Sequence, residues 1–259
     1  MDLGLAGRTA LITGGSKGIG RAIAEGLAAE GVHLHLAART KNDLESARDA
    51  IRSRWNVNVA IHPADLSSGD ACRALAEAAS EIDILINNAG AIPGGDLQAV
   101  GEPRWREAWD LKVFGFINLV REVYPTMAER KRGVIINVIG VGGEILNAHY
   151  IAGSTGNAAL MAFSRALGAE SFDRGVRVIG VNPCMVATDR MRTLLEARAE
   201  KQLGDPSRWR EFTRELPQGR PAEPSEVADT VVFLASDRAS YISGTVITID
   251  GGMVHRRAG

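Results

Sequence analysis

Short apolar runs alternate with longer amphipathic stretches along most of the chain. The runs are rich in Val and Ile and are mostly apolar on both faces, which is typical of strands in a parallel sheet that helices cover on both sides. They occupy residues 9–13, 33–37, 58–62, 82–87, 134–139, 176–181 and 245–249. The alternation predicts an α/β fold, a doubly wound and mostly parallel sheet of about seven strands within a single domain, residues 1–259.

Apolar residues between the runs recur at helical spacing. Ile19, Ile23 and Leu27 follow one another every four residues after the first run, as on one face of a helix. Long helices are predicted at about 103–127 and 150–172. The alternation therefore extends almost to the end of the chain, and no linker divides it.

Helix starts can be read at three places in the sequence. Thr40 with Asp43, and Ser67 with Asp70, have the spacing of a capping box before a helical stretch. Pro224 fits the first turn of a further helix, because a proline at that position gives up no hydrogen bond.

One segment, residues 190–216, interrupts the alternation before the last run. It is highly charged and helical in pattern. We predict a helical insertion here, which either covers a substrate site as a lid or forms a simple surface addition.

Composition and charge exclude several classes of protein. The 259 residues include 30 Lys and Arg against 31 Asp and Glu, so that a net charge of −1 gives no electrostatic reason to expect nucleic acid or a membrane as partner. Two Cys and five scattered His form neither a disulfide framework nor a metal site. The first 15 residues lack the pattern of a signal peptide, and we expect a cytoplasmic protein.

A glycine-rich loop follows the first apolar run and opens the first predicted helix. Residues 13–20 read TGGSKGIG, with Gly14, Gly18 and Gly20 at the spacing Gly-x3-Gly-x-Gly. Glycines at such a turn let the backbone approach a pyrophosphate at a helix N-terminus. The position between strand and helix favours a nucleotide site over a plain glycine turn.

With this loop and four further motifs, the chain resembles the short-chain dehydrogenase/reductase family, whose members are single-domain NAD(P)-binding oxidoreductases with a Rossmann fold. The other motifs are Asp65 in PADLS, NNAG at 87–90, Asn182-Pro183 with Thr188, and SGTVITIDGG at 243–252. The resemblance implies a cofactor site made by Gly14, Ser16, Lys17, Gly18, Ile19, Gly20, Arg39, Asp65, Leu66, Asn88, Ala89, Gly90, Tyr150, Pro183, Val186 and Thr188.

The end of the second run indicates which cofactor is used. A carboxylate there would accept the ribose 2′-OH of NAD and repel a 2′-phosphate, but Ala38 offers none. Arg39 can bind a phosphate with two hydrogen bonds, and Lys17 adds a second positive charge. We therefore expect NADP(H) rather than NAD(H), unless both are only solvated surface charges.

The catalytic positions depart from the family pattern. The family uses a Tyr with a Lys four residues later, an upstream Ser, and an Asn in the preceding long helix. Here Tyr150 is followed by Ser154 where Lys is expected, Gly140 takes the place of Ser, and Asp110 that of Asn. The family usually has Gly at the position of Cys184.

These departures have a predictable cost. A tyrosine has a pKa near 10, so that little tyrosinate exists at neutral pH to act as a base. Alcohol oxidation therefore suffers more than ketone reduction, which needs the protonated form of Tyr150. Loss of one oxyanion donor costs roughly a hundred- to a thousand-fold in rate.

Two functions fit this sequence. The first is an NADP(H)-dependent reductase of a carbonyl substrate with Tyr150 as proton donor. The second is a catalytically impaired NADP(H)-binding protein that acts as a sensor or partner subunit, in which Tyr150 only packs or contacts the cofactor. An engineered inactive variant is disfavoured, because three positions differ rather than one.

The resemblance also implies a homo-oligomer, a tetramer or dimer packed through the two long helices and the C-terminal strand. Four residues would suit a buried face on the second helix: Ala158, Leu160, Met161 and Phe163. Packing within one subunit is the alternative. Substrate determinants are expected in residues 141–149 and 190–216, where the pattern is weakest.

Overall fold

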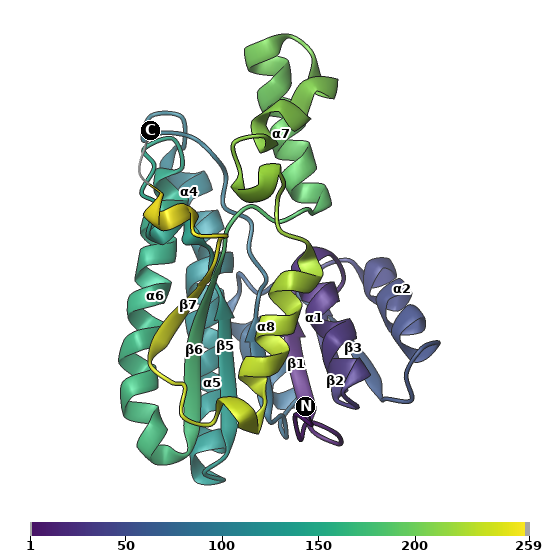
Figure 1. Ribbon diagram of the computed structural model, residues 1–259. Coiled ribbons are helices and arrows are strands. Elements are labelled where there is room, and N and C mark those ends of the chain that lie inside the picture. Colours follow the sequence, from purple (N-terminus) through teal and green to yellow (C-terminus); the bar gives the residue numbers. More distant parts are fainter. Residues whose placement is uncertain (1, 257–259) are drawn as a thin grey trace.

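Seven parallel strands form one sheet in the computed structural model, which describes residues 2–256 (Figure 1). The strand order is β3-β2-β1-β4-β5-β6-β7, and each neighbouring pair runs parallel. The strands are β1 (Thr9–Thr13), β2 (His33–Ala38), β3 (Val59–Pro63), β4 (Ile84–Asn87), β5 (Gly133–Val138), β6 (Val176–Pro183) and β7 (Thr245–Ile249). The predicted doubly wound fold is confirmed, and strand ends differ from the predicted ones by at most two residues.

Eight α-helices connect or flank these strands within the described residues. They are α1 (Gly18–Ala29), α2 (Lys41–Arg52), α3 (Gly69–Ala78), α4 (Glu102–Trp109), α5 (Gly115–Glu129), α6 (Ile151–Ser171), α7 (Asp189–Leu203) and α8 (Pro224–Ala235). No helix of residues 2–256 is both long enough and apolar enough to cross a membrane.

The two faces of the sheet carry separate hydrophobic cores. Alternate residues of a strand point to opposite faces, so that Ile12 of β1 joins the core under α1, α2 and α8. Its neighbour Leu11 joins the core under α3 and α5. The same alternation divides Ile84 from Leu85 in β4, and it explains why the runs are apolar on both faces.

The first long predicted helix is interrupted. Between α4 and α5, residues Asp110–Phe114 form a π-helical turn. Such turns often occur at functional sites, because the extra residue changes which side chains face inward. The second long helix, α6, ends one residue before the predicted Phe172. Leu160 and Met161 of α6 are buried within the chain, which corrects the expectation that they are available to a second subunit.

The two predicted capping boxes are corrected by the structure. Thr40 precedes α2 without a side-chain cap, and the Asp43 side chain pairs with Lys17. The cap of α3 is Ser68 and not Ser67, whose hydroxyl donates to Asp65. Pro224 does open α8, where Glu223 and Glu226 form a reciprocal capping box.

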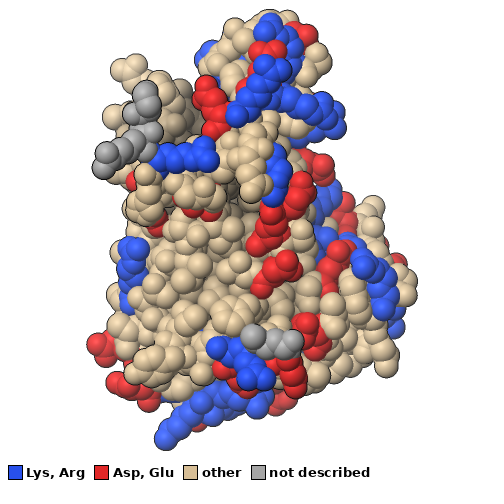
Figure 2. Space-filling model, in the orientation of Figure 1, with Lys and Arg blue, Asp and Glu red and all other residues tan. Residues whose placement is uncertain are grey.

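The insertion at 190–216 is helical. It comprises most of α7 and a 3-10 segment, Pro206–Thr213. Figure 1 shows it above the sheet, on the side where the strands end. Figure 2 shows that many charged side chains gather on this projecting part. Leu195 and Ala199 of α7 are nevertheless buried. The insertion therefore has an apolar side, through which α7 packs against the 3-10 segment.

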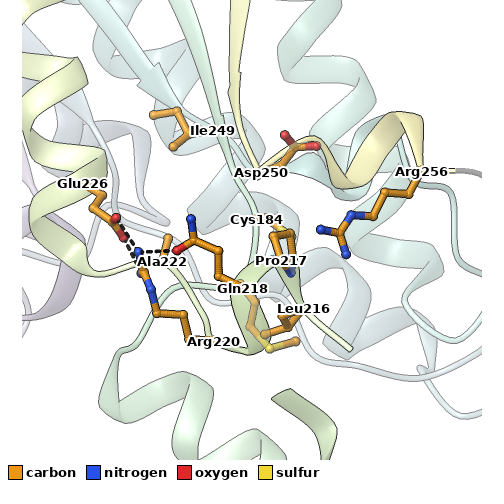
Figure 3. Close-up of a pocket in the computed structure, with 12 residues that line it drawn as sticks. Cys184, Leu216, Pro217, Gln218, Arg220, Ala222, Glu226, Ile249, Asp250 and Arg256 are labelled. Atoms are coloured by element: carbon orange, nitrogen blue, oxygen red, sulfur yellow. Dashed lines mark hydrogen bonds and ion pairs between the residues drawn. The ribbon is translucent and has the colours of Figure 1, made fainter. Parts of the chain in front are cut away.

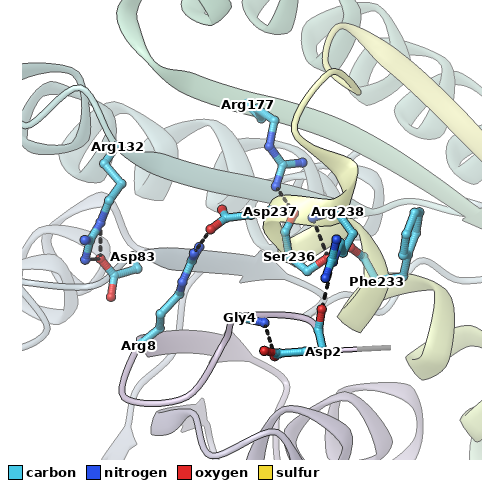
Figure 4. A network of polar contacts seen from close by, with 10 residues as sticks. All are labelled: Asp2, Gly4, Arg8, Asp83, Arg132, Arg177, Phe233, Ser236, Asp237 and Arg238. Atoms are coloured by element: carbon cyan, nitrogen blue, oxygen red, sulfur yellow. Dashed lines mark hydrogen bonds and ion pairs between the residues drawn. The ribbon is translucent and has the colours of Figure 1, made fainter.

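Polar contacts join the elements at the opposite edge, where the strands begin (Figure 4). Arg177 donates to the carbonyl oxygens of Leu234 (2.8 Å) and Ser236 (2.9 Å), and Arg8 pairs with Asp237. These contacts join β6 and the residue before β1 to the end of α8. They have a structural role, and they leave the carboxyl edge of the sheet for a ligand.

At the carboxyl edge of the sheet, the hydroxyl group of Thr13 joins the end of β1 to the turn after β4. Oγ1 of Thr13, the last residue of β1, accepts hydrogen bonds from the backbone N–H groups of Asn88 (2.9 Å) and Ala89 (3.0 Å). The Asn88 side chain donates in return to the carbonyl oxygen of Thr13 (3.1 Å). The glycine loop and the turn after β4 are thereby held side by side.

Candidate active site

A cavity of about 580 Å³ lies at the carboxyl edge of the sheet. Its wall combines the loops after β1, β2, β3, β4, β5 and β6 with the beginnings of α6 and α7. These segments lie far apart in the sequence, and the parallel direction of the strands brings them together. An elongated ligand with both phosphate and ring groups suits such a crevice.

The glycine loop forms one wall and has the predicted geometry. Gly14 and Gly18 have φ values of +66° and +55°, a conformation that other residues rarely adopt. A Cβ atom at Gly20 would lie 2.2 Å from the carbonyl oxygen of Gly14, so that α1 can pack against its own loop only through glycine. The start of α1 is thus open to a phosphate group.

The end of β2 presents the basic group expected for a 2′-phosphate. Arg39 lines the cavity and is exposed, with no acidic partner among the described residues. Lys17 also lines it but forms an ion pair of 2.8 Å with Asp43. Asp43 therefore neutralises the positive charge of Lys17. Of the two predicted basic residues, Arg39 is the one whose charge is not balanced by a neighbouring carboxylate.

Most of the expected cofactor residues line this cavity. They are Gly14, Ser16, Lys17, Gly18, Ile19, Arg39, Leu66, Asn88, Ala89, Gly90, Tyr150, Pro183 and Thr188. Gly20, Asp65 and Val186 do not. Asp65 accepts hydrogen bonds from the backbone (3.1 Å) and hydroxyl (2.9 Å) of Ser67, and Val186 is buried beside a bridge to Ala222.

The inner end of the cavity lies where β5 ends. Gly140 is there, with φ of +120°, and it brings no hydroxyl to the site. Its carbonyl oxygen accepts a hydrogen bond of 3.3 Å from the Asn157 side chain of α6. Asn157 also lines the cavity and is buried, and its Oδ1 atom has no hydrogen-bond partner. The sequence reasoning missed this residue.

The structure corrects the helical register of the catalytic pattern. Ser154 does not line the cavity: it is buried, and its hydroxyl accepts from the Asn147 backbone (3.2 Å). Residues four apart on a helix share one face, so that the position one turn before Asn157 is Gly153. A Cβ atom at Gly153 would lie 2.0 Å from the Tyr150 ring, which therefore occupies the space of the missing side chain.

The third correction concerns the long helix. Asp110 is exposed and does not line the cavity. In the π-helical turn it is Lys112 that faces inward, and its Nζ atom donates to the carbonyl oxygen of Val138 (2.9 Å). Only glycine fits at position 90, because a Cβ atom there would lie 2.3 Å from Cδ of Lys112. A charged residue in an amphipathic stretch is usually predicted to be exposed to solvent. For this reason, sequence analysis did not identify Lys112 as a residue of the site.

Burial, and to a smaller extent the nearby positive charge of Arg190, lower the pKa of Lys112 to about 7. Arg190, at the start of α7, spans the cavity mouth and donates to the carbonyl oxygens of Gly90 (3.4 Å) and Ile92 (2.9 Å). Burial also raises the pKa of Tyr150, which Arg190 only partly offsets. At neutral pH Tyr150 therefore stays protonated, whereas Lys112 is poised between its two forms.

A second, smaller cavity of about 270 Å³ lies between the segment after the insertion and the end of β7 (Figure 3). On one side Arg220 pairs with Glu226 (2.8 Å) and donates to Gln218 (3.3 Å). Cys184 lines both cavities, and burial raises the pKa of its thiol. Among residues 2–256, no cluster of His, Cys, Asp and Glu side chains is placed to hold a metal ion.

The chain is similar to known oxidoreductases over nearly its whole length. A family described as "Enoyl-(Acyl carrier protein) reductase" matches residues 14–254. The chain is 31% identical to the 3-oxoacyl-(acyl-carrier-protein) reductase of Staphylococcus epidermidis over 95% of its own length and 98% of the relative's. It is 33% identical to galactitol 2-dehydrogenase of Cereibacter sphaeroides, with 96% and 95% covered.

Solved structures give the same picture. The L-sorbose reductase of Gluconobacter frateurii, in complex with NADPH and L-sorbose, superposes with a TM-score of 0.93 at 32% identity and covers 99% of this chain and 100% of that one. A 3-oxoacyl (acyl-carrier-protein) reductase from Agrobacterium tumefaciens with bound NADP has a TM-score of 0.87 at 29% identity, with 96% and 95% covered.

The buried lysine predicts a pH-dependent gain in stability on its removal. Below pH 7 both states of the chain hold the Lys112 proton, and the folded state carries the full cost of the buried charge, roughly 5 kcal/mol at most. Between about pH 7 and 10.5 the folded lysine is neutral while the unfolded one stays charged, so the cost shrinks as pH rises. Lys112→Met should therefore raise Tm by several degrees at pH 6 and by less at pH 9.5.

Thermal unfolding at both pH values measures this effect, with Lys201→Met, at an exposed lysine of α7, as the matched control. An equal Tm change at pH 6 and pH 9.5, or a change shared by the control, would contradict the account of Lys112.

Proposed function

The chain belongs to the short-chain dehydrogenase/reductase family, and we propose that it is an NADP(H)-dependent oxidoreductase that reduces the carbonyl group of a small molecule. The observation that carries this proposal is the continuity of the cavity. It runs from the glycine loop and Arg39, at the ends of β1 and β2, to Tyr150 and Lys112 beside the end of β5. One cavity thus combines a nucleotide site with proton-bearing side chains.

The residues of the cavity fit NADP(H). The cradle at Gly14 and Gly18 has room for a pyrophosphate, and the space beside Arg39 suits a 2′-phosphate. Relatives bound to NADPH and NADP support the same choice. When bound, NADPH supplies a hydride to a carbonyl carbon, while the carbonyl oxygen takes a proton from the protein.

Tyr150 is the proposed proton donor for the reductive direction. Its ring lines the cavity, and its hydroxyl makes no hydrogen bond to another described residue, so that it is available to a ligand. The raised pKa keeps the proton in place at neutral pH. The tyrosinate left after transfer regains a proton from solvent. Reduction is therefore favoured over alcohol oxidation, which would need tyrosinate as a base.

Substrate recognition is proposed to rest on residues 141–149 and on the insertion at 190–216. Arg190 already joins the start of α7 to the turn after β4 across the cavity mouth. The insertion projects on the same side of the sheet. We propose that it acts as a lid over the substrate end of the cavity.

A homo-oligomer, a tetramer or dimer, is the proposed assembly. Few charged side chains lie over β7 and the neighbouring part of α6 in Figure 2. All residues of the edge strand β7 are half-buried, and the exposed face of α6 carries small side chains at helical spacing: Thr155, Ala159, Ala162, Ala166 and Ala169. Helices with small side chains can approach closely, which suits packing against a second copy.

The assembly is tested by light scattering. We expect a mass of two or four times the 27.6 kDa chain, and a shift toward the monomer in Ala162→Glu, which places a charge on the exposed face of α6. A wild-type protein that stays monomeric at micromolar concentration would contradict this assembly.

If the protein prefers NADPH, removing the positive charge of Arg39 should weaken NADPH binding, whereas removing that of a nearby lysine should not. Arg39→Ala should raise the Kd for NADPH about tenfold and leave the Kd for NADH nearly unchanged, because only NADPH carries the 2′-phosphate. Lys41→Ala removes the same charge two residues away and is the control. Tighter binding of NADH than NADPH by the wild-type protein would overturn the choice of cofactor.

The reaction itself is tested by NADPH oxidation with a panel of ketones and aldehydes. We expect turnover with at least one of them, and a loss of about 10²- to 10⁴-fold in Tyr150→Phe. Tyr241→Phe, at a tyrosine that is 89% exposed, should behave as wild type. Unchanged turnover in Tyr150→Phe would exclude Tyr150 as donor. NADPH binding without turnover on any carbonyl would favour the sensor or partner subunit, an alternative that the relatives do not support.

A further inference from the structure

Two side chains from opposite walls meet the end of β5. Lys112 reaches it from the π-helical turn and donates to the carbonyl oxygen of Val138 (2.9 Å). Asn157 reaches it from α6 and donates to the carbonyl oxygen of Gly140 (3.3 Å). Both line the inner end of the cavity, two residues apart along the same strand end.

Neither side chain is satisfied by the protein. Lys112 is 8% exposed and makes one hydrogen bond, and no carboxylate among the described residues pairs with it. Asn157 is 3% exposed, and its Oδ1 atom is buried without a partner. A buried ammonium without a counter-charge and a buried unpaired carbonyl are both costly. A ligand in the cavity would supply the missing partners.

The surroundings of Lys112 are arranged around its side chain. The π-helical turn brings it inward, and Gly90 leaves room for its stem. The Phe116 ring lies 4.8 Å from Nζ at its centroid, which favours the charged form of the amine. A leucine or methionine would fill the same space without a desolvation cost. The cost of burying this amine is therefore better explained by a chemical role than by packing.

We propose that Lys112 is a catalytic residue, whose ammonium group donates a hydrogen bond to the substrate carbonyl oxygen as that oxygen gains negative charge. This inference rests on the proposed reductase function. Val138 occupies one of the three N–H donors of Lys112 and leaves two for a ligand. Positive charge in a site that excludes water stabilises a developing alkoxide far more than it would in solution.

The two side chains also stand in exchanged places. The family pattern puts a lysine on the helix that carries Tyr and an asparagine in the preceding long helix. Here the cavity-facing residue of α6 is Asn157, and the preceding helical stretch supplies Lys112. The site therefore contains one amine and one amide, as in the family pattern, but each comes from the helix that carries the other in that pattern.

The charge of Lys112 sets the pH range of the reaction. The other charged or titratable residues at this end of the cavity are Arg190 and Asp189 of α7, Tyr150 at the start of α6, and Cys184 after β6, whose thiol burial keeps protonated. Lys17, Arg39 and Asp43 lie beside β1 and β2, at the other end. Burial and Arg190 lower the pKa of Lys112 to about 7, so kcat/KM for reduction should fall as pH rises through that value.

Exchange of the two residues provides the sharpest test. Lys112→Asn and Lys112→Met should each lower kcat/KM for carbonyl reduction by about 100-fold or more and leave the Kd for NADPH nearly unchanged. The double variant Lys112→Asn with Asn157→Lys restores an amine to the cavity from the other wall. It should regain at least tenfold over Lys112→Asn alone. The control Lys131→Met, at an exposed lysine after α5, should match wild type.

A second measurement is independent of turnover. In wild-type protein with ¹³C-labelled lysine, NMR should show one lysine Cε resonance that titrates near pH 7 and is absent in Lys112→Met. Wild-type kcat/KM in Lys112→Met would overturn the role of Lys112 while the reductase function stands. Titration of every lysine near pH 10 would overturn the predicted fall of kcat/KM near pH 7. Failure of the wild-type protein itself to reduce any carbonyl would instead overturn the proposed function.

Discussion

Every strand of the sheet runs in the same direction, and the site depends on this constraint. Parallel strands bring all their carboxyl ends to one edge, so that the glycine loop, the turn after β4 and the end of β5 meet although about 120 residues separate the first from the last. The hydroxyl of Thr13 fixes the first two by accepting two backbone hydrogen bonds. The carbonyl oxygens after β5 then anchor the groups at the inner end of the cavity, Lys112 and Asn157.

The two ends of the cavity differ in how far their positive charges are buried. At the outer end, Arg39 is exposed to water, so that its charge costs the fold little free energy. At the inner end, Lys112 is buried, and the fold must offset the cost of its charge elsewhere. Stability given up at a functional site is common in enzymes. By comparison, Arg177 at the far edge of the sheet donates to the carbonyl oxygens of Leu234 and Ser236, and these contacts hold β6 to the end of α8.

The sequence was sufficient to predict the fold, and most of the residues that it proposed for the nucleotide end line one cavity. The strand runs, the glycine loop and Arg39 are local signals. Each can be interpreted from a few consecutive residues, without knowing which other segments lie nearby in the fold. The catalytic end failed for a geometric reason. Spacing counted from Tyr150 leads to Ser154, but the Tyr150 ring lies over Gly153, and the cavity-facing position is Asn157. Lys112 was concealed in the same way, because only the π-helical turn makes it face inward.

The central claim is that this cavity transfers hydride from NADPH to a carbonyl carbon. Deuterium transfer tests it most directly: the protein is incubated with NADPH that carries deuterium at C4 of the nicotinamide, in both stereochemical forms, and the products of a carbonyl panel are analysed by mass spectrometry. The account predicts an alcohol that is one mass unit heavier with one of the two forms and unlabelled with the other. NADPH that binds while no product gains deuterium from either form would contradict it.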